Sequence, residues 1–255
     1  MYEIFATAVV QNDDILKARA ILAGVTKSQE YHRFMRIQHF EPQDPSTRGL
    51  PAIKEIQKER NTNPHVPAWV ELNAILLKQQ YTVRIHTKVN MDEVEGAKND
   101  SANRPVIPPT RVRVLKWCEM PDPPSQHLAP WISQRRALDI LDPRAENILL
   151  ANRYQRTSNV YEESYDYRSG KLTYSLTKQW LIDPSVGTDE IPNLATADEF
   201  APFWLLHVRA VVESKAEAMQ QAIARLAAVR EELMGVFEFK AFDRRALDTR
   251  CMLPA

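Results

Sequence analysis

The feature that most constrains this chain is an apolar run near its C-terminal end that leads without a break into a long alanine-rich segment. Residues 203–212 are rich in the aromatic and β-branched residues that favour a strand. Ser214 and Glu217 then have the spacing of a capping box, in which each side chain accepts a hydrogen bond from the other residue's backbone amide at the start of a helix. Gly235 follows where a helix commonly ends. The large apolar residues of this helix recur at helical spacing, namely Met219, Ile223, Leu226 and Leu233.

Burial of each of these four side chains is worth about 1.5–3 kcal/mol, which exceeds the few tenths expected from charge pairs on the solvent face. The helix therefore needs a covering surface. We expect the strand at 203–212 and the long helix to pack together, and the rest of the chain to be organised around them.

Composition limits the class of protein further. The 255 residues carry 33 basic and 33 acidic side chains, so no long-range field would draw the chain to nucleic acid or to an anionic membrane. Cys118 and Cys251 have no metal-ligand spacing and fit a reducing compartment. Neither a basic leader nor an apolar stretch of membrane-spanning length is present, so we expect neither secretion nor a membrane anchor.

Alternating and apolar patterns predict seven or eight strands, mostly in antiparallel meanders. The predicted strands occupy 2–10, 31–40, 81–89, 111–117, the two arms of a hairpin at 159–182 that turns at Ser169-Gly170, 203–212 and 236–242. A short helix is predicted from the Asn12-Asp13-Asp14 cap to Gly24, and others at 69–77, with a strand as the alternative for 74–77, and at 134–141. This tally favours an α+β, β-rich fold: a predominantly antiparallel multistranded β-barrel, flanked by a short N-terminal helix and a long C-terminal helix.

We expect residues 1–255 to form one domain with two flexible insertions. Residues 41–67 carry five prolines among polar residues and predict a long loop. Residues 91–109 are acidic, then polar, then proline-rich, with too few apolar residues to order themselves.

The hairpin has one apolar and one polar face, and the polar face points either to solvent or to a polar barrel interior. In the second case, charged residues of several strands would line a tunnel that binds a polyphosphate. These residues are Arg84, His86 and Lys88, then Arg111, Arg113 and Lys116, and finally Glu162 and Asp166. The simpler interpretation is that they are solvated strand faces.

A metal-dependent tunnel phosphatase would need several carboxylates alternating along one strand, whereas the opening strand offers Glu3 alone. His207 is interpreted as a hydrogen-bonded core histidine rather than a catalytic group. No serine-nucleophile motif, metal-ligand spacing or glycine-rich phosphate loop occurs. We therefore assign no catalytic, metal-binding or cofactor-binding residue and expect no cofactor. The basic tail at 240–250 has interleaved acids and predicts a solvated end.

Both ends of the chain resemble one family. The opening Tyr2-Glu3-Ile4-Phe5-Ala6-Thr7-Ala8-Val9-Val10, followed by a capped helix, is similar to the start of the Mediator subunit 18 family. The close is also similar: Pro202-Phe203-Trp204-Leu205-Leu206-His207-Val208, the long helix, Val236-Phe237-Glu238-Phe239-Lys240 and Asp243-Arg244-Arg245-Ala246-Leu247. The resemblance spans nearly the whole chain, rests on apolar patterns, and has the insertions of a fungal member.

The resemblance implies a nuclear, non-catalytic subunit of the Mediator head module, which acts in transcription coactivation by RNA polymerase II. It implies a heterodimer with subunit 20 and binding of a C-terminal helix of subunit 8, with no membrane and no direct nucleic-acid contact. Trp69, Trp131 and Trp180 are of the type that anchors interfaces, although for Trp180 we prefer a core position. Partner-binding residues stay unassigned. The rival hypothesis is a β-barrel tunnel phosphohydrolase, similar to an RNA triphosphatase, acting on a nucleotide or RNA terminus.

Overall fold

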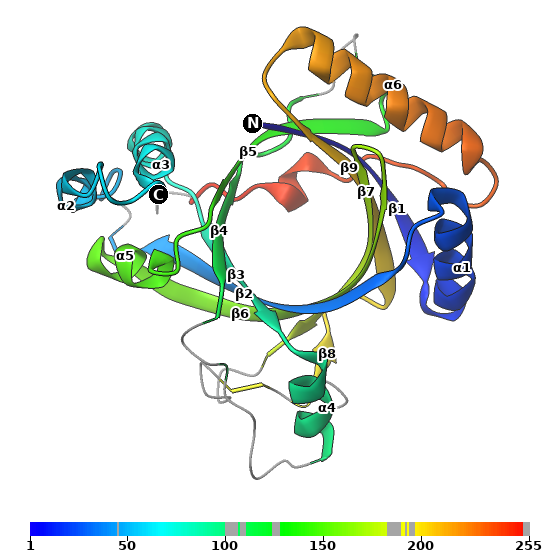
Figure 1. Ribbon diagram of the computed structural model, residues 1–255, viewed down its shortest axis with the longest axis horizontal. Helices are drawn as coiled ribbons and strands as arrows, with labels where there is room; N and C mark the ends of the chain where they lie inside the picture. The colour runs from blue at the N-terminus through cyan, green and yellow to red at the C-terminus, as the bar shows by residue number, and fades with distance from the viewer. Residues whose placement is uncertain are drawn as a thin grey trace.

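A computed structural model of the chain describes residues 1–255 except 45, 100–106, 108–110, 124–127, 183–189, 192, 194–196 and 252–255. Its centre is a closed antiparallel barrel of eight strands in the order β6-β2-β3-β4-β5-β1-β9-β7, closed by pairing of β6 with β7 (Figure 1). The strands are β1 (Tyr2–Gln11), β2 (Tyr31–Pro42), β3 (Val83–Val89), β4 (Arg113–Cys118), β5 (Ile132–Ile140), β6 (Tyr154–Ser169), β7 (Leu172–Leu181) and β9 (Phe203–Val212). A two-residue strand, β8 (Asp198–Glu199), pairs with β7. The predicted β-rich barrel is confirmed.

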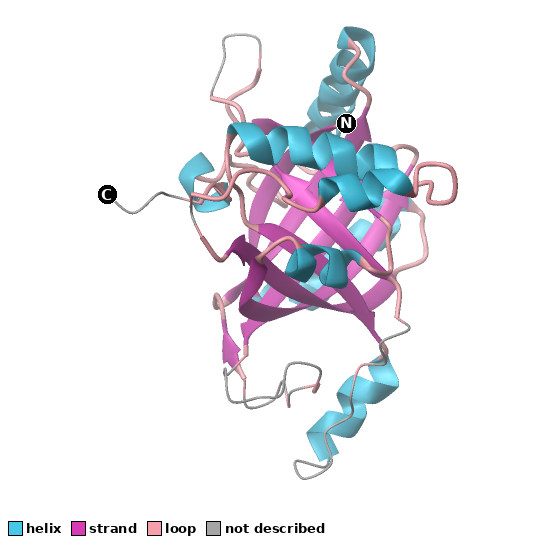
Figure 2. Cartoon of the chain, turned by 90° about the vertical axis from the view of Figure 1, so that its left-hand side faces the viewer, coloured by secondary structure: helices cyan, strands magenta, loops and turns pink. Residues whose placement is uncertain are grey.

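Helices cover the outside of the barrel wall (Figures 1 and 2). They are α1 (Ile15–Thr26), α2 (Ile53–Lys58), α3 (Val66–Lys78), α4 (Met91–Asn99), α5 (Ala145–Ala151) and α6 (Ala216–Glu232), with 3-10 turns η1 (Asn12–Asp14) and η2 (Arg244–Leu247). The short N-terminal and long C-terminal helices expected at the two ends of the chain are thus present.

The apolar cores lie between the barrel wall and these helices. Helices α1 and α6 bury the outer side chains of β1, β9 and β7, whereas α2, α3 and α5 bury those of β2 to β5. Leu226 of α6 is 1% exposed and Leu206 of β9 is fully buried. The apolar face of the long helix therefore packs on the strand that precedes it in the sequence. A third, smaller cluster joins α4 to β2, β6 and β7. Met219 and Ile223 of α6 are partly buried against the core that α1 and α6 form with β1, β9 and β7.

Two predicted elements are wrong. Residues 134–141 are not helical but belong to β5, where Leu138 and Ile140 face the outer core at every second position. Residues 236–242 are extended but make one isolated bridge, between Ala8 and Phe239, rather than a strand. Strand β5 pairs with β1 only as far as Ala6. Residues 236–242 lie beside the next part of β1, where Ala8 bridges to Phe239.

Helix and turn boundaries also differ from the predictions. Helix α6 begins after an extended Lys215 with no side-chain cap, so the Ser214 capping box does not form. Helix α1 continues past Gly24 and ends at Lys27, whose φ is 50°. The hairpin turn is Gly170-Lys171, one residue later than predicted, because Ser169 still pairs with Leu172. Gly170 supplies the positive φ of 59° that the tight turn requires.

The two proposed insertions contain ordered helical structure. Residues 41–67 hold α2 and the start of α3, and Leu50 and Ile56 are buried at 2% and 7% exposure, so the interpretation of this segment as a long loop is wrong. Three apolar residues of this proline-rich segment, Leu50, Ile56 and Val66, pack in the core outside the barrel. Within 91–109, α4 places Val94 in the third core, and most of the remainder lies outside the described residues.

Candidate functional site

The barrel lumen is the candidate site because the polar face of nearly every strand points into it. It encloses a cavity of about 290 Å³. Strand β1 contributes Glu3, Phe5 and Thr7 at alternate positions, and the other strands contribute in the same way. The polar face of the predicted hairpin thus faces a wet barrel interior, one of the two alternatives for that face, and supplies Glu162, Ser175, Thr177 and Gln179.

Glu3 is the centre of an ion-pair cluster inside this lumen. Its Oε2 accepts a hydrogen bond from Arg135 Nε at 2.6 Å, and its Oε1 lies 3.2 Å from Arg209 Nη1. Burial by itself would raise the pKa of the Glu3 carboxyl, but the charges around it, led by Arg135, lower that pKa well below its usual range. Glu3 is therefore an ionised carboxylate already shared by two guanidinium groups.

His207 lies beside this cluster on β9, with its ring edge-on to Phe5 at 4.8 Å between ring centroids. Burial lowers the pKa of His207 to about 3, so the ring is neutral at pH 7. Its Nε2 has no hydrogen-bond partner within the described residues. The prediction of a hydrogen-bonded core histidine is therefore wrong for this atom.

The charged residues for which a tunnel lining was the alternative to solvated strand faces lie in different places. Four of them line the lumen cavity, namely Arg84, His86, Lys116 and Glu162. Arg113 is on the outer face, where it pairs with Glu146 of α5. Lys88 is exposed and donates to the Tyr31 hydroxyl, and Arg111 pairs with Glu93 of α4. Asp166 is bound to Arg33 at 2.6 Å.

Arg135 and Arg209 were missed by the sequence analysis. Arg135 fell in the segment predicted to be helical, and Arg209 interrupts an apolar strand. The alternation of small, polar and apolar residues in 132–140 is the signal that could have placed Arg135 on a strand and facing inward.

The last described residues form a C-terminal strap, defined as residues 236–251, that crosses one opening of the barrel (Figure 1). At its first end, Lys240 N donates to Thr7 O at 2.9 Å and Thr7 Oγ1 donates to Lys240 O at 2.7 Å. At its second end, Thr82 N donates to Thr249 O at 2.7 Å. Phe242 and Leu247, between these anchors, line the lumen cavity. The backbone of the strap is therefore anchored to the barrel, while its basic side chains Lys240, Arg245 and Arg250 are exposed, as the prediction of a solvated end requires.

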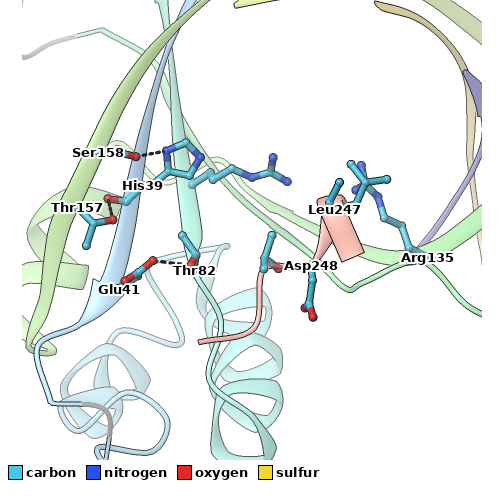
Figure 3. A pocket seen from close by; sticks show the side chains of 11 residues that line it. His39, Glu41, Thr82, Arg135, Thr157, Ser158, Leu247 and Asp248 are labelled. Carbon is cyan, nitrogen blue, oxygen red and sulfur yellow. Dashed lines mark hydrogen bonds between the residues drawn. The ribbon is translucent and has the colours of Figure 1, made fainter. Parts of the chain in front are cut away.

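A second cavity of about 310 Å³ lies where the strap meets the barrel rim. Figure 3 shows His39 bonded to Ser158, at 2.8 Å, on the strand side of this cavity, and Leu247 and Asp248 of the strap opposite. Thr82 Oγ1 donates to Glu41 at 2.9 Å. Arg84 and Arg135 line both this cavity and the lumen, so the two spaces adjoin.

The lumen carboxylates are engaged by protein groups. Besides Glu3, Asp139 lies 3.0 Å from Lys116 Nζ, and Glu162 accepts a hydrogen bond from Gln179 at 2.9 Å. Among the described residues there is no group of three or more His, Cys, Asp or Glu side chains placed to hold a metal ion. The same residues include no helix long and apolar enough to cross a bilayer.

The tryptophans proposed as exposed interface anchors are in the core. Trp69 is fully buried and donates from Nε1 to Asp142 at 3.2 Å, and Trp131 is 9% exposed beside Phe239. The interface hypothesis for these two is wrong. The preferred core position of Trp180 is confirmed, at 8% exposure.

Fold and lumen together define a closed antiparallel barrel, covered by helices outside, charge-paired inside and crossed at one end by its own C-terminal strap. A family model described as Med18 protein matches residues 2–250. The chain therefore belongs to the Med18 family, as its two ends had indicated.

Similar solved structures include one that supports the fold. The Mediator head module of Schizosaccharomyces pombe contains a chain that is similar with a TM-score of 0.61 at 11% identity, covering 94% of this chain and 98% of that one. A putative adenylyl cyclase from Hippeastrum with a dominant triphosphatase activity gives a TM-score of 0.44 at 9% identity, covering 96% and 94%. A putative adenylate cyclase from Bacillus halodurans gives 0.41 at 8% identity, covering 96% of both chains. No curated protein matches the sequence significantly.

Proposed function

We propose that this chain is a non-catalytic subunit of the Mediator head module and acts in transcription coactivation by RNA polymerase II in the nucleus. The observation that carries the proposal is the Med18 family match over residues 2–250. The fold likeness to a chain of the S. pombe head module, over 94% of this chain, supports it. In this role the barrel is a rigid scaffold whose outer surface contacts other subunits.

The proposed partners are subunit 20, in a heterodimer, and a C-terminal helix of subunit 8. An apolar helix needs an apolar surface on which to bury one face. Large side chains exposed around α1 and the turn after α6 offer such a surface: Leu16 is 71% exposed, Met234 70%, Val236 47% and Val9 46%. Two of these residues, Val9 and Val236, also line a cavity of about 190 Å³ together with Ile21 of α1.

Affinity purification from cells tests the proposal. The chain, tagged at its own locus, should recover the other head-module subunits in stoichiometric amounts. Recovery of the intact chain without any Mediator subunit would overturn the proposal. Leu16→Asp should reduce recovery of a partner while leaving the melting temperature unchanged, whereas Leu150→Asp, at an exposed leucine on α5, is the matched control.

The rival tunnel phosphohydrolase makes a different prediction. A metal-dependent reaction would need lumen carboxylates free to hold a divalent cation, yet Glu3 is shared by Arg135 and Arg209. We therefore expect purified protein with triphosphate substrates and Mg²⁺ or Mn²⁺ to release no phosphate above the blank. Release that is lost in Glu162→Gln would establish the rival.

A further inference from the structure

Arg84, like Arg135, lies at the junction of the lumen cavity and the cavity under the strap. It lines both spaces, which measure about 290 and 310 Å³. A guanidinium at such a place has room beside it for a ligand larger than a single water molecule.

The charge balance of the lumen singles out the same residue. Five basic side chains line it, and four of them have a carboxylate partner. These pairs are Arg33 with Asp166 at 2.6 Å, Lys116 with Asp139 at 3.0 Å, and both Arg135 and Arg209 with Glu3. For Arg84, the described part of the chain offers no carboxylate within ion-pair distance.

Neutral polar atoms without partners line the same cavity. Within the described residues, His86 Nε2 and Ser175 Oγ are buried and make no hydrogen bond. Burial, followed by the charge of Arg84, holds the pKa of His86 well below its usual range, so the ring is neutral and presents one N–H donor. An unpaired guanidinium that lines the same cavity as unsatisfied imidazole and hydroxyl groups is the arrangement that an anion would complete.

The acidic groups near Arg84 are already engaged. Of those that line the two cavities, Glu162 accepts from Gln179 and Glu41 accepts from Thr82. Asp248 accepts from Arg250 Nη2 at 2.6 Å. None of these three carboxylates lies within ion-pair distance of Arg84, so they leave its guanidinium available.

We propose that the barrel lumen binds one small tetrahedral oxyanion of the phosphate type, with Arg84 as its charged anchor and lumen hydroxyl and imidazole groups as further donors. Arginine matches such an anion because its planar fork donates two parallel hydrogen bonds. The proposal goes beyond the subunit role, which requires no ligand in the lumen, and it involves no bond cleavage.

Calorimetric titration of the purified chain with inorganic phosphate, in the absence of divalent metal, tests the site. We expect saturable binding at one site per chain. Arg84→Gln should weaken that binding by about tenfold or more, since a charge-assisted contact is lost. Arg225→Gln, on the exposed face of α6, is the matched control and should bind as the wild type does. Acetate, a planar anion, should bind more weakly than phosphate.

Absence of saturable binding to the wild-type chain would overturn the proposal, and so would equal affinity in Arg84→Gln. If Arg84→Gln does not fold, crystals of the wild type soaked in tungstate decide instead. Anomalous scattering should place the tungstate beside Arg84, and tungstate found only on the outer surface would refute the site.

Discussion

The inner and outer faces of the barrel wall are built on opposite principles. Outer side chains such as Leu206 and Leu115 are fully buried beneath helices, whereas inner ones such as Arg84 and Arg209 are partly accessible through the lumen. The outer face is stabilised by apolar burial, and the inner face by ion pairs and hydrogen bonds. The barrel is therefore stabilised mainly by the apolar contacts between its outer face and the helices.

The largest effect should come from the outer face. Trp69→Ala removes a fully buried indole and its hydrogen bond to Asp142, and should lower the free energy of unfolding by about 3–5 kcal/mol. Urea unfolding measures it. Val70→Ala, at the neighbouring residue that is 37% exposed, should cost about 0.5 kcal/mol or less. Equal losses in both variants would contradict the comparison.

A strong effect is also expected at the ion pairs of the lumen. Glu3→Gln leaves Arg135 and Arg209 without their carboxylate and should cost about 3 kcal/mol at pH 7. Glu162 accepts a hydrogen bond from the neutral Gln179, so Glu162→Gln should cost about 1 kcal/mol. If Glu3→Gln proved as mild as Glu162→Gln, the lumen cluster would not be stabilising.

The Glu3 effect should also depend on pH in a defined direction. The folded-state pKa of Glu3 lies below the ordinary value of 4.5, so its contribution is present above that pH and is lost as the pH falls below it. The gap between wild type and Glu3→Gln, measured by urea unfolding, should therefore shrink between pH 5 and acidic pH. A gap that is constant with pH would contradict this assignment.

A smaller effect is expected at His207, and it appears only on acidification. Because its folded pKa is about 3 and its ordinary value 6.5, the unfolded chain binds a proton below pH 6.5 that the folded chain does not. His207→Phe should therefore reduce the loss of stability between pH 6.5 and 5 by about 2 kcal/mol. Phe5→Leu removes the ring contact but keeps the imidazole, and should retain the wild-type slope.

The smallest effect should come from the strap. Thr7→Val removes the hydrogen bond from Thr7 Oγ1 to Lys240 O and should cost about 1 kcal/mol in unfolding free energy. Hydrogen exchange should at the same time rise at the Lys240 amide. Thr157→Val, at an exposed threonine whose hydroxyl makes only a long contact of 3.5 Å with His39 O, is the matched control. Unchanged exchange at Lys240 would indicate that this bond does not hold the strap.

Much of the fold could be predicted because strand periodicity is local. Seven of the eight barrel strands correspond to predicted ones, and α3 follows from the spacing of Trp69, Leu72 and Leu76. Strand β5 was missed because Ala137, Leu138 and Leu141 also fit a helical spacing. Residues 236–242 were predicted as a strand because their local pattern does not reveal that a partner strand is available along a short stretch only.

Little of the candidate site could be predicted. Glu3, Arg135 and Arg209 lie on three different strands, and their meeting depends on the register of β1 with β5 and β9. No local pattern encodes that register. For the same reason, the sequence grouped Arg113 with Lys116, although the pleat of β4 sends one outward to Glu146 and the other into the lumen.

By itself, the sequence determined seven of the eight barrel strands, the polar face of the hairpin, and the resemblance of both ends to the Med18 family. Only the tertiary structure decided that the polar faces point inward. The physical reason is that the helices of the two main cores, α1, α2, α3, α5 and α6, bury the apolar faces from outside. The polar faces therefore turn to a lumen in which most charges are paired. The strap was decided in the same way, since Phe242 and Leu247 enter the lumen once the closed wall provides an opening to cross.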